Sequence, residues 1–280
     1  PAMHPNMWLN PATQSNVKLL TERGFHILEP SVGPLTSGDT GIGRFPESFE
    51  IIDFFLQSIG SKSDLLGKKV LITAGGTRED IDPVRYIGNR SSGKQGYALA
   101  NACAGRGAKV VVIAANVSLA DPAGVEVIKV NTALEMGEKL FELAPAQDLI
   151  MMSAAVSDYR VADRSQSKIK RNGSALKLEL IENPDLIATV SVAERPNRQN
   201  QIIMAFAAET SISIEQAQEK LLRKGVDLLF LNDVANQDVF GSESNGGYLL
   251  DSAGVVAEIP YQSKDTLAED LLDFVVKRLD

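Results

Sequence analysis

The segment GNRSSGKQG, residues 88–96, carries residue types that bind phosphate groups in many proteins. It differs by one residue from the P-loop pattern G-x-x-x-x-G-K-[ST], in which backbone amides and a lysine hold phosphates and a hydroxyl binds Mg²⁺. Gly88, Gly93 and Lys94 match the pattern, but Gln95 stands where the hydroxyl should be. The segment therefore either handles a nucleotide in another way or resembles a P-loop by chance.

The surroundings of this segment also depart from a P-loop. In a P-loop the strand runs directly into the glycine loop, whereas here the nearest apolar run ends at Ala74. We interpret residues 74–96 as one long Gly- and Ser-rich loop, followed by a helix that begins near Gly93. Its backbone amides, the helix amino terminus and the hydroxyls of Ser91 and Ser92 would still attract an anion. A loop that only caps the helix is the alternative.

A basic segment, DYRVADRSQSKIKR, occupies residues 158–171 and follows an apolar run that ends at Val156. It holds five basic and two acidic residues, a local charge of +3 in a chain of net charge −8. A run of charges is usually a solvated surface. Its position after a predicted strand favours contact with a phosphorylated ligand instead.

Lys220 and Lys224 lie one turn apart on a predicted helix that Gly225 closes. Like charges at this spacing repel each other by a few tenths of a kcal/mol unless an anion joins them. The alternative is that the lysines only complement the carboxyl end of the helix dipole.

Three further residues have an ordinary structural interpretation when each is taken alone. Asn183 and Asp185, in ENPDLI, are typical helix-capping residues. Phe206, in MAFAAET, is typical of a hydrophobic core.

The elements that must position these residues follow a regular pattern from Lys68 onward. Runs that are apolar throughout alternate with helical periodicity, which indicates a parallel sheet covered by helices on both faces. The runs are VLITA, VVVIAA, DLIMMSAAV, QIIMAFAA and DLLFLND, beginning at residues 70, 110, 148, 201 and 227, and residues 246–260 are typical of a hairpin. The sequence predicts an α/β, Rossmann-like three-layer fold with a mostly parallel sheet over residues 67–280, with ligands at the carboxyl ends of the strands.

Residues 58–66 are rich in Ser and Gly, which is typical of a linker between domains. Residues 1–57 would then form a separate piece with two short helical patterns. This piece is too small and irregular to build a convincing core by itself. Its first residues, PAMHPNMWLN, lack the pattern of a signal peptide and read like the middle of a motif.

Composition and charge argue against several classes of protein. The 280 residues contain no uninterrupted apolar stretch of the ~18 residues that a membrane span needs, so no membrane association is expected. A net charge of −8 argues against nucleic-acid binding, which depends on basic patches. A single cysteine, Cys103, cannot form an internal disulfide and cannot complete a usual zinc site with only two histidines. These features favour a soluble, cytoplasmic protein.

A nicotinamide dehydrogenase is also disfavoured. AGGT, residues 74–77, follows a predicted strand, but no G-x-G-x-x-G is present. Asn116, rather than an acidic residue, follows the second predicted strand, so the usual ribose ligand is missing.

Several motifs in one order resemble a known family. The run ITAGGTREDIDPVRYIGNRSSGKQGYALA is followed by AAVSDYR, KIKR, NPD, FAAET and the paired lysines. Together they resemble phosphopantothenoylcysteine synthetase, the carboxyl-terminal half of the bacterial bifunctional coenzyme A biosynthesis proteins, over essentially all of residues 67–280. Several specific motifs in register are far stronger evidence than any one of them alone.

The resemblance implies a ligase that activates 4'-phosphopantothenate with CTP and Mg²⁺ and then joins it to cysteine, in a cytoplasmic homodimer. It implies catalytic roles for Asn89 and Lys168. The implied phosphopantothenate-binding residues are Arg85, Asn89, Ser91, Ser92 and Gly93. The implied CTP-binding residues are Met152, Ser153, Ala154, Asp158, Lys168, Asn183, Pro184, Asp185, Leu186, Phe206, Lys220 and Lys224.

Residues 1–57 resemble the carboxyl-terminal remnant of the flavodoxin-like, FMN-dependent phosphopantothenoylcysteine decarboxylase that forms the other half. This sequence departs from that pattern, since His4 replaces the motif asparagine and Ser37 replaces the motif cysteine, the expected proton donor. A serine hydroxyl is far less acidic than a thiol. We therefore expect FMN only if an intact decarboxylase half lies upstream, and a non-catalytic nucleotide-binding module stays open as the other alternative.

Overall fold

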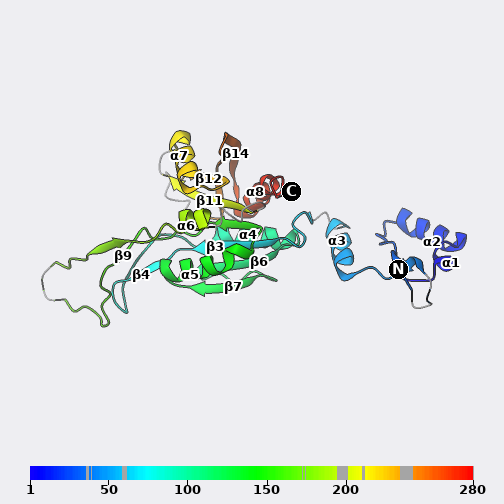
Figure 1. Cartoon of the computed structure of the whole chain (residues 1–280), viewed down its shortest axis with the longest axis horizontal. Coiled ribbons are helices and arrows are strands. Elements are labelled where there is room, and N and C mark those ends of the chain that lie inside the picture. Colours follow the sequence, from blue (N-terminus) through cyan, green and yellow to red (C-terminus); the bar gives the residue numbers. More distant parts are fainter. Residues whose placement is uncertain are drawn as a thin grey trace. The chain divides into compact units, whose positions relative to one another are not determined.

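The structure is a computed structural model that describes residues 1–35, 38, 40–58, 62–171, 173, 175–193, 201–209, 212–233 and 242–279. The chain divides into two compact units, Pro1–Leu66 and Gly67–Asp280. The larger unit holds the elements that build the site, and Figure 1 labels them.

The smaller unit contains the helices α1 (Pro5–Trp8), α2 (Pro11–Glu22) and α3 (Ser48–Ser58) and the antiparallel strands β1 (Ser31–Pro34) and β2 (Thr40–Arg44). The ring Nδ1 of His4 accepts a hydrogen bond from the amide of Asn6 at 3.2 Å, so this side chain caps α1. Ser37 lies outside the described residues.

The larger unit is built on an eight-stranded sheet with the order β14-β13-β12-β11-β8-β3-β6-β7. Its parallel strands are β3 (Lys69–Gly75), β6 (Lys109–Ala115), β7 (Glu126–Val130), β8 (Leu149–Met152), β11 (Ile202–Glu209) and β12 (Leu228–Asp233). The hairpin of β13 (Ser244–Asp251) and β14 (Gly254–Ser263) joins β12 in antiparallel fashion. This arrangement confirms the predicted Rossmann-like fold with a mostly parallel sheet.

Helices cover both faces of the sheet because the strands between them are apolar on both sides. The helices are α4 (Lys94–Gly105), α5 (Ala133–Leu143), α6 (Leu186–Ala193), α7 (Ile214–Lys224) and α8 (Lys264–Val276), and a 3₁₀ turn spans Ala144–Ala146. α4 packs against α8, β3 and β6. α5, α6 and α7 share the other core, which contains Met136, Leu186 and Leu221.

The strand order changes direction at β3. The chain runs from β3 outward through β6 and β7, and then returns to place β8 on the other side of β3. Gly76 and Ala155 form a parallel bridge that continues the pairing just beyond these two strands. In open α/β sheets, ligands bind outside the carboxyl ends of the strands at such a switch point.

The structure corrects the expectation of one long loop between the first strand and the helix. Residues 78–88 fold back on themselves as the antiparallel strands β4 (Arg78–Asp80) and β5 (Tyr86–Gly88). A second pair, β9 (Tyr159–Val161) and β10 (Leu180–Glu182), packs beside β4. We call these four strands, together with the described residues that connect the two strands of each pair, the arm, which projects away from the central sheet in Figure 1.

Candidate active site

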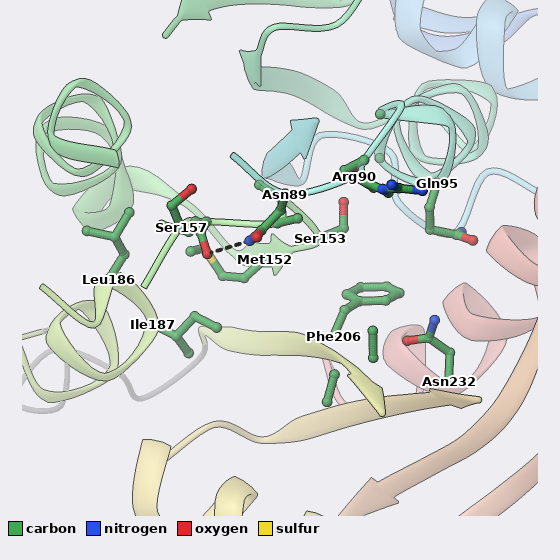
Figure 2. Close-up of a pocket in the computed structure, with 18 of the residues that line it drawn as sticks. Asn89, Arg90, Gln95, Met152, Ser153, Ser157, Leu186, Ile187, Phe206 and Asn232 are labelled. Carbon is green, nitrogen blue, oxygen red and sulfur yellow. Dashed lines mark hydrogen bonds between the residues drawn. The ribbon is translucent and has the colours of Figure 1, made fainter. Parts of the chain in front are cut away.

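A cavity of about 390 Å³ lies at the switch point. Figure 2 shows side chains from several elements that converge on it. Four segments line it: residues 89–96 from the loop before α4 and its first turn, 152–158 from the end of β8 and the loop after it, 183–187 from the start of α6, and 206–208 from β11. Five single residues complete the lining, namely Lys220, Lys224, Asn232, Asn245 and Lys264.

The end of β8 is tied to β3 by a buried threonine. Ser153 Oγ donates to the carbonyl of Thr73 at 2.7 Å, and the amide of Ala154 donates to Thr73 Oγ1 at 3.2 Å. Thr73 is fully buried, so these bonds are shielded from water. They fix the β8 backbone where it forms the floor of the cavity.

Glycine is required where α4 meets this floor. A Cβ built on Gly96 would lie 2.5 Å from Ala74 Cβ and 2.9 Å from Ser153 Oγ. Gly93, which precedes the helix, has φ 82, and its Cβ would lie 2.5 Å from Val117 Cγ2. With glycine at these two positions, the first turn of α4 can approach the strand ends more closely than it could with any residue that has a Cβ.

Asn89 is held against the β8 loop. Its Nδ2 donates to the carbonyl of Val156 at 3.1 Å, as Figure 2 shows from the cavity side. One residue further along that loop, the amide of Ser157 donates to Thr77 Oγ1 at 2.9 Å. The carboxamide of Asn89 thus has a fixed direction at the edge of the cavity.

The segment at the start of α6 supplies residues that line the cavity, and one of them also caps the helix. Asn183 Nδ2 donates to the carbonyl of Ser157 at 2.8 Å, and Asn183 Oδ1 accepts from Arg160 Nη1 at 3.0 Å. Asp185 Oδ1 accepts from the amide of Ala188 at 3.2 Å. The capping interpretation is therefore correct for Asp185, whereas the side chain of Asn183 bonds to Ser157 and Arg160 instead, and both residues line the cavity.

The two lysines of α7 are each paired with a carboxylate. Lys224 Nζ lies 3.1 Å from Asp185 Oδ2, and Lys220 Nζ lies 3.2 Å from Glu209 Oε1. Burial by itself would raise the pKa of Asp185, but the amide of Ala188 and the charge of Lys224 outweigh it and lower that pKa. An anionic ligand at this end of the cavity would compete with carboxylates for these lysines.

Phe206 brings an aromatic surface to the cavity. Its ring lies 5.7 Å from that of Phe230, in an edge-to-face arrangement with an interplanar angle of 61°. Such contacts hold the ring in one orientation. A planar heterocycle could stack on it.

Most of the predicted site residues line this one cavity. They are Asn89, Ser91, Ser92, Gly93, Met152, Ser153, Ala154, Asp158, Asn183, Pro184, Asp185, Leu186, Phe206, Lys220 and Lys224. Within the described part of the chain, Arg85 and Lys168 are not among the residues that line this cavity.

Arg85 and Lys168 belong instead to the arm. The Arg85 guanidinium pairs with Asp82 at 2.5 Å and donates to the carbonyl of Ile169 at 3.0 Å. The hydrogen bond from the Arg85 side chain is the largest contribution that holds the pKa of Asp82 below its usual range. Burial acts in the opposite direction, and hydrogen bonds from the amides of Val84, Ile169 and Arg85 lower the pKa further. Lys168, beside Ile169, is exposed.

Sequence reasoning did not assign several residues that line the cavity. They are Arg90, Lys94, Gln95, Gly96, Ala155, Val156, Ser157, Ile187, Ala207, Ala208, Asn232, Asn245 and Lys264. Those at the ends of β8, β11 and β12 follow from the rule that ligands bind at strand ends. Lys264 follows a hairpin far along the chain, and no local pattern singles it out.

No helix within the described ranges is long and apolar enough to cross a membrane. Over the same ranges, no group of three His, Cys, Asp or Glu side chains is placed to hold a metal ion.

Family models match both parts of the chain. Residues 65–279 match the DNA/pantothenate metabolism flavoprotein C-terminal domain, and residues 1–60 match the flavoprotein family. The coenzyme A biosynthesis bifunctional protein CoaBC of Mycobacterium bovis is 44% identical over 290 residues, which cover 99% of this chain and 69% of that protein. The corresponding protein of Escherichia coli is 38% identical over 286 residues, covering 100% and 69%.

Solved structures agree with these sequence matches. The C-terminal domain of a coenzyme A biosynthesis bifunctional protein CoaBC superposes with a TM-score of 0.65 and 31% identity, covering 78% of this chain and 98% of that domain. A Cab2 variant in complex with phosphopantothenate-cysteine has the same fold, with a TM-score of 0.60 and 18% identity over 83% of this chain and 90% of that one. The chain therefore belongs to the family of bifunctional coenzyme A biosynthesis proteins, with a DNA/pantothenate metabolism flavoprotein C-terminal domain that follows a flavoprotein-family segment.

Proposed function

We propose that residues 67–280 form a CTP-dependent phosphopantothenate–cysteine ligase, joined by the linker 58–66 to a decarboxylase remnant in residues 1–57. The observation that carries the proposal is the cavity at the switch point, because it gathers the Asn89–Gly93 loop and the α6 and α7 residues. The family resemblance predicts that the Asn89–Gly93 loop binds phosphopantothenate and that the α6 and α7 residues bind CTP. Mg²⁺, a homodimer and a cytoplasmic location belong to the same proposal and come from the resemblance.

The proposed reaction has two steps. The carboxylate of 4'-phosphopantothenate attacks the α-phosphorus of CTP, and the bond to pyrophosphate breaks, which leaves an acyl-cytidylate. The amine of cysteine then attacks the acyl carbon, CMP leaves, and the amine loses a proton. A free carboxylate would have to expel oxide, so the anhydride is needed before an amide can form.

The residues of the cavity suit these steps. The Asn89 carboxamide is neutral and can donate to an acyl oxygen without repelling the adjacent phosphate. Lys220 and Lys224 can stabilise the charge on the departing pyrophosphate. The Phe206 ring offers a face for the cytosine base.

The cavity also fits an Mg²⁺ ion that arrives with the nucleotide. Asp158 and Asp185 are its lining carboxylates within the described ranges, and Mg²⁺ typically takes one or two carboxylates together with substrate phosphates. Either carboxylate would hold the ion, which supplies charge neutralisation on the phosphates when bound.

The order of chemistry gives a direct test of the proposed function. Protein mixed with 4'-phosphopantothenate, CTP and Mg²⁺ but no cysteine is expected to release pyrophosphate in a fast phase, up to about one equivalent per site, because the bound intermediate is shielded from water. Adding cysteine should then release CMP and start continuous turnover. CDP and orthophosphate would contradict the mechanism, and ligand binding without nucleotide cleavage would favour a binding module.

Lys168 needs a separate test because it lies on the arm and is not among the described residues that line the cavity. If it contacts the triphosphate during the reaction, Lys168→Gln should lose roughly 2 kcal/mol of transition-state stabilisation in kcat/KM for CTP. Lys170→Gln, in the same basic segment, is the matched control for general charge attraction. An unchanged kcat/KM in Lys168→Gln would remove this residue from the site.

A further inference from the structure

The parallel pairing of β3 with β8 continues past the ends of the two strands. The amide of Ala155 donates to the carbonyl of Gly75 at 2.8 Å, and the amide of Thr77 donates to the carbonyl of Ala155 at 3.2 Å. The next bond of a regular parallel ladder would run from the amide of Ser157 to the carbonyl of Thr77. The structure has a different bond at that place.

A side chain replaces the backbone acceptor in this next bond. The amide of Ser157 donates to Thr77 Oγ1 at 2.9 Å, and the hydroxyl of Ser157 makes a longer bond to the carbonyl of Thr77, at 3.4 Å. Thr77 is fully buried and Ser157 is 4% exposed, so water competes little for either bond. The threonine hydroxyl therefore ends the ladder and fixes the backbone that follows it.

The bond to Thr77 reaches Asn89 through a single peptide group. The amide of Ser157 and the carbonyl of Val156 are the two polar ends of one planar unit. Its N–H donates to Thr77 Oγ1, and its C=O accepts from Asn89 Nδ2 at 3.1 Å, the bond that Figure 2 draws as a dashed line. A rotation of this peptide would turn the carbonyl away from Asn89, so the threonine hydroxyl holds the acceptor that orients Asn89.

Asn89 depends on this peptide more than the neighbouring carboxamide of Asn183 does. The carbonyl of Ser157 accepts from Asn183 Nδ2 at 2.8 Å, but Asn183 Oδ1 also accepts from Arg160 Nη1 at 3.0 Å. Among the described residues, the carbonyl of Val156 is the one hydrogen-bond partner of the Asn89 carboxamide. Loss of the threonine hydroxyl would therefore misdirect Asn89 first.

We infer that Thr77 is a positioning residue for the proposed ligase, which aims the Asn89 carboxamide at the acyl oxygen through the Val156–Ser157 peptide. This inference rests on the proposed function. Thr77 itself is not among the described residues that line the cavity. Valine has nearly the shape of threonine but no hydroxyl, so Thr77→Val would leave the buried amide of Ser157 without its acceptor. Serine keeps the hydroxyl and should keep the bond.

Thr77→Val is expected to lower kcat for ligation about tenfold or more, because a small misplacement of a reacting group is costly, with the KM for CTP nearly unchanged. Thr77→Ser should restore most of kcat. Thr132→Val is the matched control, since Thr132 Oγ1 also accepts from a backbone amide, that of Glu135 at 3.2 Å, but caps α5 outside the described lining of the cavity. Both valine variants should have a lower unfolding temperature, and only Thr77→Val should have a lower kcat.

A double-mutant cycle separates positioning from a general loss of structure. If Thr77 acts through Asn89, Thr77→Val should change kcat by less than about threefold in an Asn89→Ala background, because the side chain that it positions is already gone. Full additivity of the two substitutions overturns the inference, as does a kcat like that of the parent in Thr77→Val. Thr77→Cys, whose thiol is only a weak acceptor, repeats the measurements if Thr77→Val does not fold.

The NMR signals of the Asn89 side-chain amide give a test on the whole chain that does not need activity. Their absence in Asn89→Ala identifies them. Because this amide donates to Val156, its signals should shift in Thr77→Val and stay in place in Thr132→Val. Unmoved signals in Thr77→Val overturn the inference whether or not the chain is a ligase. Shifted signals in a chain without ligase activity would support the link from Thr77 to Asn89 and count against the proposed function alone.

Discussion

Replacing Asn89 with aspartate is expected to lower kcat for ligation by about 100-fold or more, which is the usual cost of losing one preorganised donor to a developing negative charge. The variant keeps nearly the same shape, but its carboxylate cannot donate to an acyl oxygen and would repel the phosphates beside it. It would also face the carbonyl of Val156, to which Asn89 Nδ2 now donates at 3.1 Å. The release of pyrophosphate without cysteine should fall with kcat.

Asn10→Asp is the matched control for this change. Asn10 caps α2 in the smaller unit by accepting a hydrogen bond from the amide of Ala12 at 2.9 Å, and aspartate is an equally good cap. It therefore adds the same charge without touching the cavity. Quenched-flow measurement of pyrophosphate and steady-state CMP release test both variants, and a kcat within about twofold of the parent for Asn89→Asp would exclude Asn89 from the chemistry.

Replacing Gly75 with alanine is expected to destabilise the larger unit by about 3–5 kcal/mol, the sum of backbone strain and overpacking. Gly75 has φ 83, a conformation that residues with a Cβ rarely adopt, and a Cβ there would collide with the carbonyl oxygen of Ala115. Ala115 is its direct partner on β6. The clash is with backbone, so it can be relieved only by separating β3 from β6 beside the switch point.

Gly105→Ala tests whether the loss of stability is specific to position 75 or would follow from replacing any glycine. Gly105 ends α4, and a Cβ at this position would meet nothing within 4 Å, so alanine there should be neutral or add up to about 1 kcal/mol through helix propensity. Urea unfolding should be followed by circular dichroism, because the single tryptophan, Trp8, belongs to the smaller unit. Equal midpoints for Gly75→Ala and the parent would contradict the close approach of β3 and β6.

The central strands could be predicted from sequence because their side chains are buried on both faces. Val70, Leu71 and Ile72 are fully buried in the strand that VLITA predicts. The arm could not be predicted in the same way. Its strands have three residues each and are largely polar or exposed, so no periodicity distinguishes Arg78–Asp80 from a loop.

The residues of the candidate site also differ in how far the sequence alone could predict them. The basic segment that begins at Asp158 was expected to contact a ligand because it follows an apolar run and strand ends mark ligand sites, whereas the role of Asp158 itself was implied only by the family resemblance. Gln95 first stood out only as a mismatch to the P-loop pattern, since the burial of its amide without a partner among the described residues is a tertiary property. Lys264 reaches the cavity only because α8 packs on α4, which no local pattern reports.

The pairing of Lys94 with Glu243 joins residues 149 positions apart in the chain. Closing so large a loop costs chain entropy before the contact returns any energy, and folds dominated by distant contacts form slowly. The cavity, whose lining includes Lys94, Asn245 and Lys264, is therefore complete only once the β13–β14 hairpin and α8 have docked on the sheet. A ligand that needs the finished cavity would stabilise the native state by mass action and slow its unfolding, while leaving the rate of folding almost unchanged.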